Sequence, residues 1–437
     1  MNFCLPSDLE NLANETKFIQ RNRKLGAVKF LELLFSQPAS IAKNSLTSLS
    51  SRLEDSGLTI SKQALDKKFN ENAVDFLKQI YLLLFEAQSK QLFHPFSIQS
   101  TLNFRSLRIL DGTSIKLPPA FQQVYPSTVG SGVKCQLEFD YLTGQLMYVE
   151  VQAGKAGDTA SGMKRLETVQ ENDLILQDLG YFQFDLFKEV NARKAFYVSR
   201  ARADTMFYVD HPEPRYHENG EIMKKYAHER LYLEEELKTI KRGETREYPK
   251  VYLGKHARFP TRLVVYRMTD QEQRQQEMRI KRRKQTKPGK VKQKSYEVSS
   301  ISTYVTNFPS EVSVEEITGL YRYRWQIELV FKSWKTDMDV DYYRRMKLER
   351  WECHFYACLI LLLLSMLITY QIRLYLWEEK GIILSEMIAM REISKRIWKV
   401  WQARDDLEQE VVMNNIIKIL ARIGRKNTKK PTQFTDQ

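Results

Sequence analysis

Four side chains that could act on a phosphate group recur at helical spacing in the last third of the chain. They follow one another at intervals of three, four and seven residues: Tyr321, Arg324, Glu328 and Lys335. At about 100° per residue, an α-helix would place all four within a stripe roughly 60° wide. A carboxylate flanked by two cations on one helix face could bind a metal ion beside a phosphate. The alternative is an exposed, salt-bridged face, because Arg324 and Glu328 form an i,i+4 pair.

The opposite side of the same segment is apolar, which indicates a helix packed on one side. This side is formed by Tyr323, Ile327, Val330 and Trp334. Ser313 and Glu316 form a capping box ahead of it. The sequence therefore predicts one helix over 313–335, with an apolar back and an ionisable front.

Two further carboxylates follow segments that we predict as β-strands. Asp111 ends the apolar run LRILD, and Asp178 ends DLILQD before Leu-Gly-Tyr. Asp111 precedes Gly112 and could simply belong to a turn. Asp173 and Asp185 compete with Asp178, but Asp173 precedes the strand and Asp185 belongs to the next predicted helix. Acids at strand ends and on a late helix could hold two Mg²⁺ ions, which activate water or a 3′-hydroxyl for phosphoryl transfer.

Other catalytic and cofactor signatures are absent from the sequence. No glycine-rich loop leads into Lys-Ser or Lys-Thr, and no dinucleotide fingerprint occurs, so we expect no nucleotide cofactor. The six histidines show no zinc-site spacing, and no Cys-x-x-Cys is present. We expect four reduced, structural cysteines: Cys4, Cys135, Cys353 and Cys358.

The charge balance is strongly basic. The 437 residues include 68 Lys+Arg and 54 Asp+Glu, a formal net charge of +14, and nine basic residues lie in an acid-free run over 279–294. This excess indicates a polyanionic partner, either nucleic acid or an anionic membrane. No secretory signal is visible, and the most apolar stretch, 357–370, is shorter than the roughly 20 residues that span a bilayer. It predicts a buried core helix, so we expect a cytoplasmic, nucleoid-associated protein without a membrane partner.

Residues 1–95 are predicted to be helical, because apolar residues recur there at helical spacing. Within them the sequence predicts a helix-turn-helix at 47–69, with a turn at Ser56-Gly57 and a second helix capped by Thr59 or Ser61. Polar side chains of that second helix suit a DNA groove: Lys62, Gln63, Lys67 and Lys68. A plain helical hairpin with a solvated face is the alternative.

From residue 100 the pattern changes to alternating strands and helices. After LRILD we predict a β-hairpin centred on 142–145, and then, in order, a helix at 161–171, a strand-like segment at 173–181, a helix at 182–194 and a strand at 195–201. This order indicates an α/β fold around a mixed sheet.

Residues 201–300 interrupt that order. They contain a charged, helix-prone stretch at 218–238, strand-like segments at 250–255 and 261–268, and the basic run, which suits a flexible loop. A strand at 301–309 then returns to the sheet. The last hundred residues are predicted to be helical, with a loose basic tail.

The spacing Tyr-x2-Arg-x3-Glu-x6-Lys is similar to the YREK signature of bacterial DDE transposases of the insertion-sequence-four group. The segments Leu-Asp-Gly-Thr at 110–113 and Asp-Leu-Gly-Tyr at 178–181 resemble those of the family's first and second catalytic aspartates. The resemblance covers about 45–375. It implies an RNase H-like mixed-sheet core with an inserted β-rich domain and α-helical N- and C-terminal regions. It also implies that Asp111, Asp178 and Glu328 are the catalytic acids and hold two Mg²⁺ ions, for which Mn²⁺ could substitute.

The resemblance assigns DNA contacts to the neighbours of Glu328. Arg324 and Lys335 would contact phosphates near the cut, and Tyr321 would help to place the terminal nucleotides. Trp325 would stack on a base.

The inserted region departs from the family pattern, because all six tryptophans lie beyond residue 320. Relatives form a DNA hairpin in which a flipped base is held by aromatic side chains, so Tyr252 or Tyr266 would have to serve here. Whether excision uses a hairpin therefore stays open. The basic run would follow the DNA backbone, with Arg282, Arg283 and Lys284 among its contacts.

We predict five regions. Residues 1–98 form a helical domain that binds DNA ends, 99–204 the first part of the catalytic core, and 205–300 the insertion with its basic loop at 279–294. Residues 301–345 complete the core with the YREK helix, and 346–437 form a helical region for dimerisation or synapsis.

The function expected from the resemblance is cut-and-paste DNA transposition. The protein would bind the terminal inverted repeats of an insertion sequence, cleave them, and join them to target DNA as a homodimer in a synaptic complex. Two alternatives remain: a catalytically inactive or domesticated DNA-binding protein, and a stand-alone RNase H-like nuclease.

Overall fold

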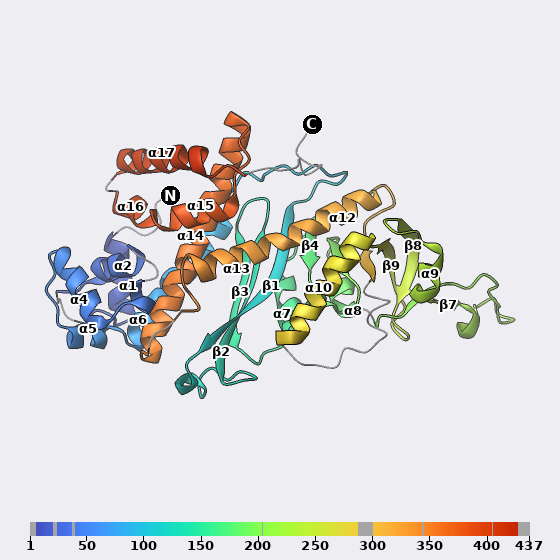
Figure 1. Ribbon diagram of the computed structural model, residues 1–437, viewed down its shortest axis with the longest axis horizontal. Coiled ribbons are helices and arrows are strands. Elements are labelled where there is room, and N and C mark those ends of the chain that lie inside the picture. Colours follow the sequence, from blue (N-terminus) through green and yellow to red (C-terminus); the bar gives the residue numbers. More distant parts are fainter. Residues whose placement is uncertain are drawn as a thin grey trace. The chain divides into compact units, whose positions relative to one another are not determined.

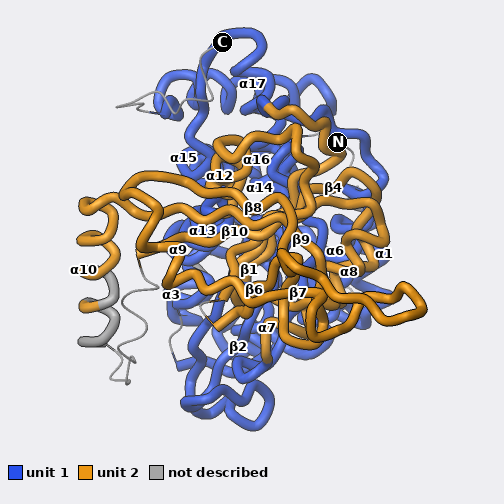
Figure 2. Tube along the Cα trace, turned by 90° about the vertical axis from the view of Figure 1, so that its right-hand side faces the viewer, with its two compact units in different colours: residues 1–99, 112–156, 325–437 blue, residues 100–111, 157–324 orange. Residues whose placement is uncertain are grey.

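The computed structural model describes residues 6–20, 24–36, 40–202, 204–286, 300–342, 345–403 and 405–426. The chain divides into two units (Figure 2). Unit 1 consists of residues 1–99, 112–156 and 325–437, and unit 2 of residues 100–111 and 157–324. Strand β1 (Ser106–Leu117) contributes its first half to unit 2 and its second half to unit 1.

Unit 2 contains most of the strands. Starting from β1, its sheet order is β4 (Asp173–Gln177), β5 (Phe196–Arg200), β10 (Ile301–Thr306), β9 (Phe259–Arg267), β8 (Thr245–Leu253), β6 (Phe207–Asp210) and β7 (His228–Leu231). Strands β1, β4 and β5 are parallel, and β10 pairs antiparallel with both β5 and β9. Every residue of β4 is buried, as expected for a parallel strand between two neighbours.

The helices of unit 2 lie beside these strands (Figure 1). They are α7 (Asp158–Lys164), α8 (Phe184–Ala192), α9 (Leu233–Thr239), α10 (Asp270–Thr286) and α12 (Val314–Arg322). Short 3₁₀ helices accompany them: η2 (Arg165–Thr168), η3 (Leu179–Tyr181), η4 (Lys224–Tyr226) and η6 (Tyr323–Trp325). The last residue of η6, Trp325, is the first residue of the final segment of unit 1. One hydrophobic core joins them: Phe187 of α8 stacks on Tyr197 of β5 at 4.4 Å between ring centroids, and the same core includes Val251 and Leu263 of β8 and β9. The inserted strands therefore share a core with the strands that come before them.

Unit 1 combines a small sheet with a helical assembly. The second half of β1 neighbours β2 (Ser131–Asp140), and β2 pairs antiparallel with β3 (Leu146–Ala153). The connecting turn needs Gly144, which has φ +79° and leaves no room for a Cβ, because one would lie 2.6 Å from the Tyr370 ring. The predicted hairpin around 142–145 is confirmed.

Helix α14 (Leu348–Lys380) forms the centre of the helical part of unit 1. The other helices are α1 (Pro6–Glu15), α2 (Ala27–Phe35), α3 (Ser40–Lys43), α4 (Leu46–Asp55), α5 (Lys62–Lys68), α6 (Glu71–Lys90), α13 (Gln326–Thr336), α15 (Glu386–Ser394), α16 (Ile397–Gln402) and α17 (Asp406–Ile423), with η1 (Pro119–Phe121) beside the small sheet. Helices α2, α3, α6, α15 and α16 all pack against α14. Among the described residues, α14 alone is long and apolar enough to cross a membrane, but 89% of its most apolar window is buried. The predicted core helix is confirmed.

Several predictions of local structure were wrong. β1 does not end at Asp111-Gly112 but continues to Leu117, because Gly112 has no side chain and the Gln136 carboxamide of β2 takes that space, 2.7 Å from where a Cβ would lie. The predicted helix at 161–171 is instead α7 followed by η2. Residues 218–238 form η4, β7 and α9 instead of one helix.

The basic run does not begin as a loop. Its first part, up to Thr286, continues helix α10, while residues 287–299 lie outside the described residues. The helix had no apolar face to predict it, since this stretch is charged nearly all round.

Candidate active site

The two candidate aspartates lie where the parallel pairing of β1 with β4 ends in unit 2: Asp178 follows β4, whereas Asp111 lies within β1, which continues to Leu117. The last paired residues of β1 and β4 are Leu110 and Gln177, and Asp111 and Asp178 follow them directly. Paired strands lie about 4.8 Å apart, so this register places the two aspartates side by side at the carboxyl ends. Both side chains are half-buried.

Arg324 approaches this pair from η6. Its Nη1 lies 3.8 Å from Oδ2 of Asp111, and the two side chains are 16% and 24% exposed. The contact is a long ion pair, so the positive charge of Arg324 offsets the negative charge of Asp111. A cation held in this way is also able to contact a phosphate.

Tyr321 attaches α12 to the end of β4. Its buried hydroxyl donates to the backbone carbonyl of Gln177 at 3.3 Å, and its ring meets Tyr304 of β10 edge to face at 5.2 Å. Burial raises the pKa of the Tyr321 hydroxyl, Arg324 acts to lower it, and Asp178 raises it further. The hydroxyl is therefore within electrostatic reach of one of the candidate acids.

Glu328 and Lys335 belong to unit 1. The predicted helix over 313–335 is confirmed except for one 3₁₀ turn within it: α12 ends at Arg322, the next three residues form η6, and α13 begins at Gln326. Two of the three residues of this turn, Tyr323 and Trp325, are aromatic and have weaker helix propensity than alanine or leucine.

Within α13 the predicted faces are confirmed. The apolar side is buried through Ile327, Val330 and Trp334, whereas Glu328 and Lys335 are half-buried. The Lys335 ammonium donates to the backbone carbonyl of Ser114 in β1 at 3.0 Å.

The capping box before α12 is only half formed. Ser313 accepts the backbone N–H of Glu316 at 3.1 Å, as predicted. The Glu316 carboxylate, however, accepts from the Thr101 backbone N–H at 2.8 Å and from the Thr101 hydroxyl at 2.7 Å. It thereby ties α12 to the segment that leads into β1.

Three neighbours of the aspartates were missed by the sequence reasoning: Asp158, Gly180 and Tyr181. Tyr181 is 2% exposed, and its pKa is raised by burial first and then by Asp158, Asp111 and Asp178. Gly180 leaves space for Asp158, because a Cβ there would lie 3.3 Å from its Oδ2. The Asp-Leu-Gly-Tyr segment pointed to Gly180 and Tyr181, but no spacing in the sequence pointed to Asp158.

The donor set at the strand ends fits a hard divalent cation. Within the described part of the chain, the Asp178 carboxylate accepts no hydrogen bond and no ion pair, which leaves both of its oxygens able to bind a ligand. Carboxylate oxygens are preferred by Mg²⁺ and Mn²⁺. Among the described residues, no group of three His, Cys, Asp or Glu side chains is close enough together to hold a metal ion.

The predicted helix-turn-helix has the expected helices. α4 ends at Asp55, and α5 begins after Ser61, whose hydroxyl accepts the Ala64 N–H at 3.2 Å. Lys62 and Lys67 are exposed, whereas Lys68 is half-buried with its ammonium 5.0 Å from the centre of the Phe18 ring.

The remaining predicted DNA contacts belong to η6 and α10. Trp325 is 55% exposed. Arg282, Arg283 and Lys284 lie in α10, but their side chains are outside the described residues.

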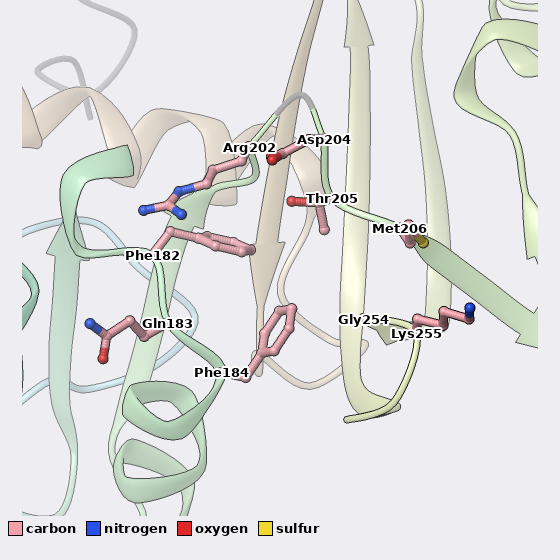
Figure 3. Close-up of a pocket in the computed structure, with 9 residues that line it drawn as sticks. All are labelled: Phe182, Gln183, Phe184, Arg202, Asp204, Thr205, Met206, Gly254 and Lys255. Carbon is pink, nitrogen blue, oxygen red and sulfur yellow. The ribbon is translucent and has the colours of Figure 1, made fainter.

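The two tyrosines proposed to hold a flipped base are engaged with acids. Tyr252 donates to Asp210 at 2.8 Å, and Tyr266 donates to Glu272 at 2.6 Å. A cavity of about 300 Å³ lies in unit 2, and the first of its lining residues along the chain is Phe182, four residues after Asp178 (Figure 3). Neither tyrosine lines this cavity. That cavity is lined by Phe182, Gln183, Phe184, Arg202, Asp204, Thr205, Met206, Gly254 and Lys255.

Comparison with known proteins identifies the class. The family described as "Transposase DDE domain" matches residues 102–364, more than half of the chain. The chain therefore belongs to the DDE transposases, and the mixed sheet with its helical flanking regions is the RNase H-like fold that the resemblance predicted.

The relatives are transposases of bacterial insertion sequences. The transposase for insertion sequence element IS231F of Bacillus thuringiensis subsp. israelensis is 33% identical over 432 residues, covering 97% of this chain and 90% of the relative. That for IS231E of B. thuringiensis subsp. finitimus is 32% identical with the same coverage. That for IS1151 of Clostridium perfringens is 29% identical, covering 83% of this chain and 78% of the relative. These matches confirm the predicted family of insertion-sequence DDE transposases, a DNA-acting enzyme class.

Proposed function

We propose that this transposase cuts the ends of an insertion sequence and joins them to target DNA, with Asp111, Asp178 and Glu328 as its catalytic carboxylates. The observation that carries the proposal is the register of β1 and β4, which places Asp111 and Asp178 side by side with Arg324 close by. Glu328 is included among the catalytic carboxylates only because of its place in the Tyr-x2-Arg-x3-Glu-x6-Lys spacing. Its position only four residues after Arg324 in the chain is compatible with that role.

The three carboxylates would hold two Mg²⁺ ions, or Mn²⁺ in their place. Bound metal would lower the pKa of the attacking water and stabilise the leaving oxygen in an in-line displacement. In the first step, water attacks a phosphodiester at the element end and frees a 3′-hydroxyl. In the second, that 3′-hydroxyl would attack a target phosphodiester by the same chemistry, so that a new phosphodiester joins element to target and the target strand is released with a free 3′-hydroxyl.

The protein's own groups have distinct roles in both steps. Arg324 would neutralise charge on the phosphate beside Asp111, and Lys335 would bind a phosphate farther along the strand. Trp325, exposed next to Arg324, would stack on an unpaired base. Tyr321 would hold α12 and the terminal nucleotides in register with Asp178.

Binding of the terminal inverted repeats is assigned to α4 and α5, with Lys62, Lys67 and Lys68 as backbone contacts. Arg282, Arg283 and Lys284 would follow the DNA from α10. Because two ends must be cut together, we propose a homodimer in a synaptic complex, acting in the cytoplasm at the nucleoid.

The test uses the full chain, Mg²⁺ and linear DNA that carries the terminal repeats. We expect cleavage at the element end and joined product, and loss of both in Asp111→Asn, Asp178→Asn and Glu328→Gln with DNA binding retained. Asp185→Asn is the matched control, because Asp185 is exposed and pairs only with Lys188 at 3.0 Å among the described residues. Absence of cleavage by the wild type would support a DNA-binding protein, and cleavage without joining would support a nuclease.

A further inference from the structure

The second half of β1 presents polar groups beyond the candidate aspartates. β4 pairs with β1 only from Ser106 to Leu110, whereas β1 continues to Leu117. Within unit 1, Ser114 and Lys116 are exposed on the same face of this continuation, as expected two residues apart on a strand. Lys335 of α13 reaches the Ser114 carbonyl and so lies beside this face.

A cavity of about 430 Å³ opens between this face and the end of α13. Its lining residues are Ser114, Lys116, Lys335, Asp341 and Tyr342. Two ammonium groups face one carboxylate, so the cavity has a net positive charge. No hydrogen bond or ion pair joins the Lys116 ammonium to any other residue that the structure describes.

The far wall of the cavity is held in place. Lys43 of α3 forms an ion pair with Asp339 at 2.7 Å and lies 5.5 Å from the centre of the Tyr342 ring. Tyr342 is nevertheless 44% exposed, and its hydroxyl makes no hydrogen bond to another described residue. A fixed aromatic ring with an available hydroxyl, opposite two lysines, is suited to a small anion.

We propose that this cavity binds one backbone phosphate of DNA, through the ammonium groups of Lys116 and Lys335 and the hydroxyl of Tyr342. The inference rests on the proposed function and adds Lys116 and Tyr342 to its DNA contacts. A contact between a lysine ammonium and a backbone phosphate does not distinguish one base from another. This contact would therefore position the duplex without contributing sequence preference.

The chain itself limits how far this phosphate lies from the cut. Five residues separate Asp111 from Lys116 on one strand, which spans at most about 18 Å. Since this limit holds for the Cα atoms of Asp111 and Lys116, we expect the bound phosphate to belong to the DNA near the cut and not to a distant part of the duplex. It could belong to the element end or to the target, because both carry the same backbone.

The experiment compares wild type with Lys116→Ala in the full chain. In the first arm, fluorescence anisotropy measures binding of a duplex that carries the terminal repeat, over a range of salt concentrations. Loss of one phosphate contact should weaken binding about three- to tenfold and reduce the slope of log K against log salt by about 1. Lys116→Arg should restore both, and Tyr342→Phe should weaken binding less.

In the second arm, pre-cut ends are joined to plasmid target at saturating protein and varied target concentration. Weaker binding of the end duplex in the first arm would assign the phosphate to the element end. Unchanged binding in the first arm, with a higher target concentration needed for joining in the second arm, would assign it to the target. Wild-type affinity and salt slope in the first arm, together with a wild-type target requirement in the second arm, would overturn the proposal.

Two controls keep the outcome interpretable. Lys188→Ala removes an exposed lysine that already pairs with Asp185, and should leave both arms unchanged. Asp111→Asn should abolish cleavage but keep the wild-type salt slope in the first arm. If the wild type itself does not cut, the proposed function fails while the anisotropy arm still reports on the phosphate site.

Discussion

The two ends of β1 and β4 in unit 2 hold aspartates in opposite ways. At the amino end, Asp173 is fully buried and accepts from Arg105 at 2.7 Å, Ser106 at 2.7 Å and Arg108 at 3.1 Å. At the carboxyl end, Asp111 and Asp178 are half-buried, and Arg324 Nη1 lies 3.8 Å from Asp111 Oδ2.

The difference separates a structural carboxylate from carboxylates available to a ligand. Both oxygens of Asp173 accept hydrogen bonds, so its charge is neutralised inside the fold, and removing that charge breaks a buried ion pair with Arg108. At the carboxyl end, Asp178 accepts no hydrogen bond and no ion pair from the described residues, so its oxygens are able to bind a metal ion. Substitutions at the two ends should therefore have opposite signatures.

The largest expected effect is on activity at the carboxyl end. Asp178→Asn should reduce DNA cleavage by at least about a thousandfold, since it removes a charge that binds metal. The thermal unfolding midpoint should change by less than about 2 °C, because Asp178 makes no hydrogen bond or ion pair to the described residues. Cleavage is measured on end DNA at saturating Mg²⁺. Activity within tenfold of wild type would remove Asp178 from the catalytic set.

At the amino end we expect the reverse. Asp173→Asn should lower the free energy of unfolding by about 3–5 kcal/mol, because one partner of a buried ion pair is lost. Urea denaturation measures this, with Asp185→Asn as the exposed control, expected within about 0.5 kcal/mol of wild type. At a temperature where the variant stays folded, cleavage should remain close to wild type. A stable Asp173→Asn protein with no cleavage would contradict the comparison.

Arg324 tests whether the carboxyl end needs a cation of defined geometry. Arg324→Lys keeps the charge but loses the planar guanidinium, so cleavage should fall about ten- to a hundredfold with a smaller loss of DNA affinity. Arg322→Lys is the matched control, since Arg322 is exposed two residues earlier. Equal effects of the two substitutions would indicate a general loss of charge contacts instead.

Much of the strand and helix order was predictable because it depends on local pattern. The apolar runs that became β4, β5 and β10 are buried by neighbours on both sides, and the core helix α14 follows directly from its composition. The continuation of β1 was not predictable, since it depends on Gln136 from another strand filling the space beside Gly112.

For the candidate site, too, the sequence predicted which residues to consider but not how the fold brings them together. Asp111 and Asp178 follow apolar runs and could be found in the sequence, whereas their shared register exists only in the folded sheet. Asp158 comes from the start of α7, and Lys116 from the unexpected half of β1. Neither belongs to a periodic pattern, so only the tertiary structure reveals them.

The smallest expected effect concerns how the carboxyl end is held. In Gly180→Ala, the new Cβ would lie 3.3 Å from Oδ2 of Asp158, so that carboxylate must move by a few tenths of an ångström. Because Asp158 acts on Tyr181 together with Asp111 and Asp178, we expect kcat for cleavage to fall about tenfold while KM for end DNA stays unchanged. Gly157→Ala is the matched control, since its Cβ would meet only Thr159 Oγ1 at 4.0 Å.

A double substitution decides whether the effect passes through Asp158. Removing the carboxylate in Asp158→Ala also removes the close contact, so adding Gly180→Ala to that background should cost little further activity. Independent, additive losses would mean that Gly180 acts through the backbone of the Asp178 turn instead. In either case the carboxyl end would prove sensitive to shifts of a few tenths of an ångström. The amino end, where Asp173 is enclosed by its partners, should affect catalysis only by unfolding.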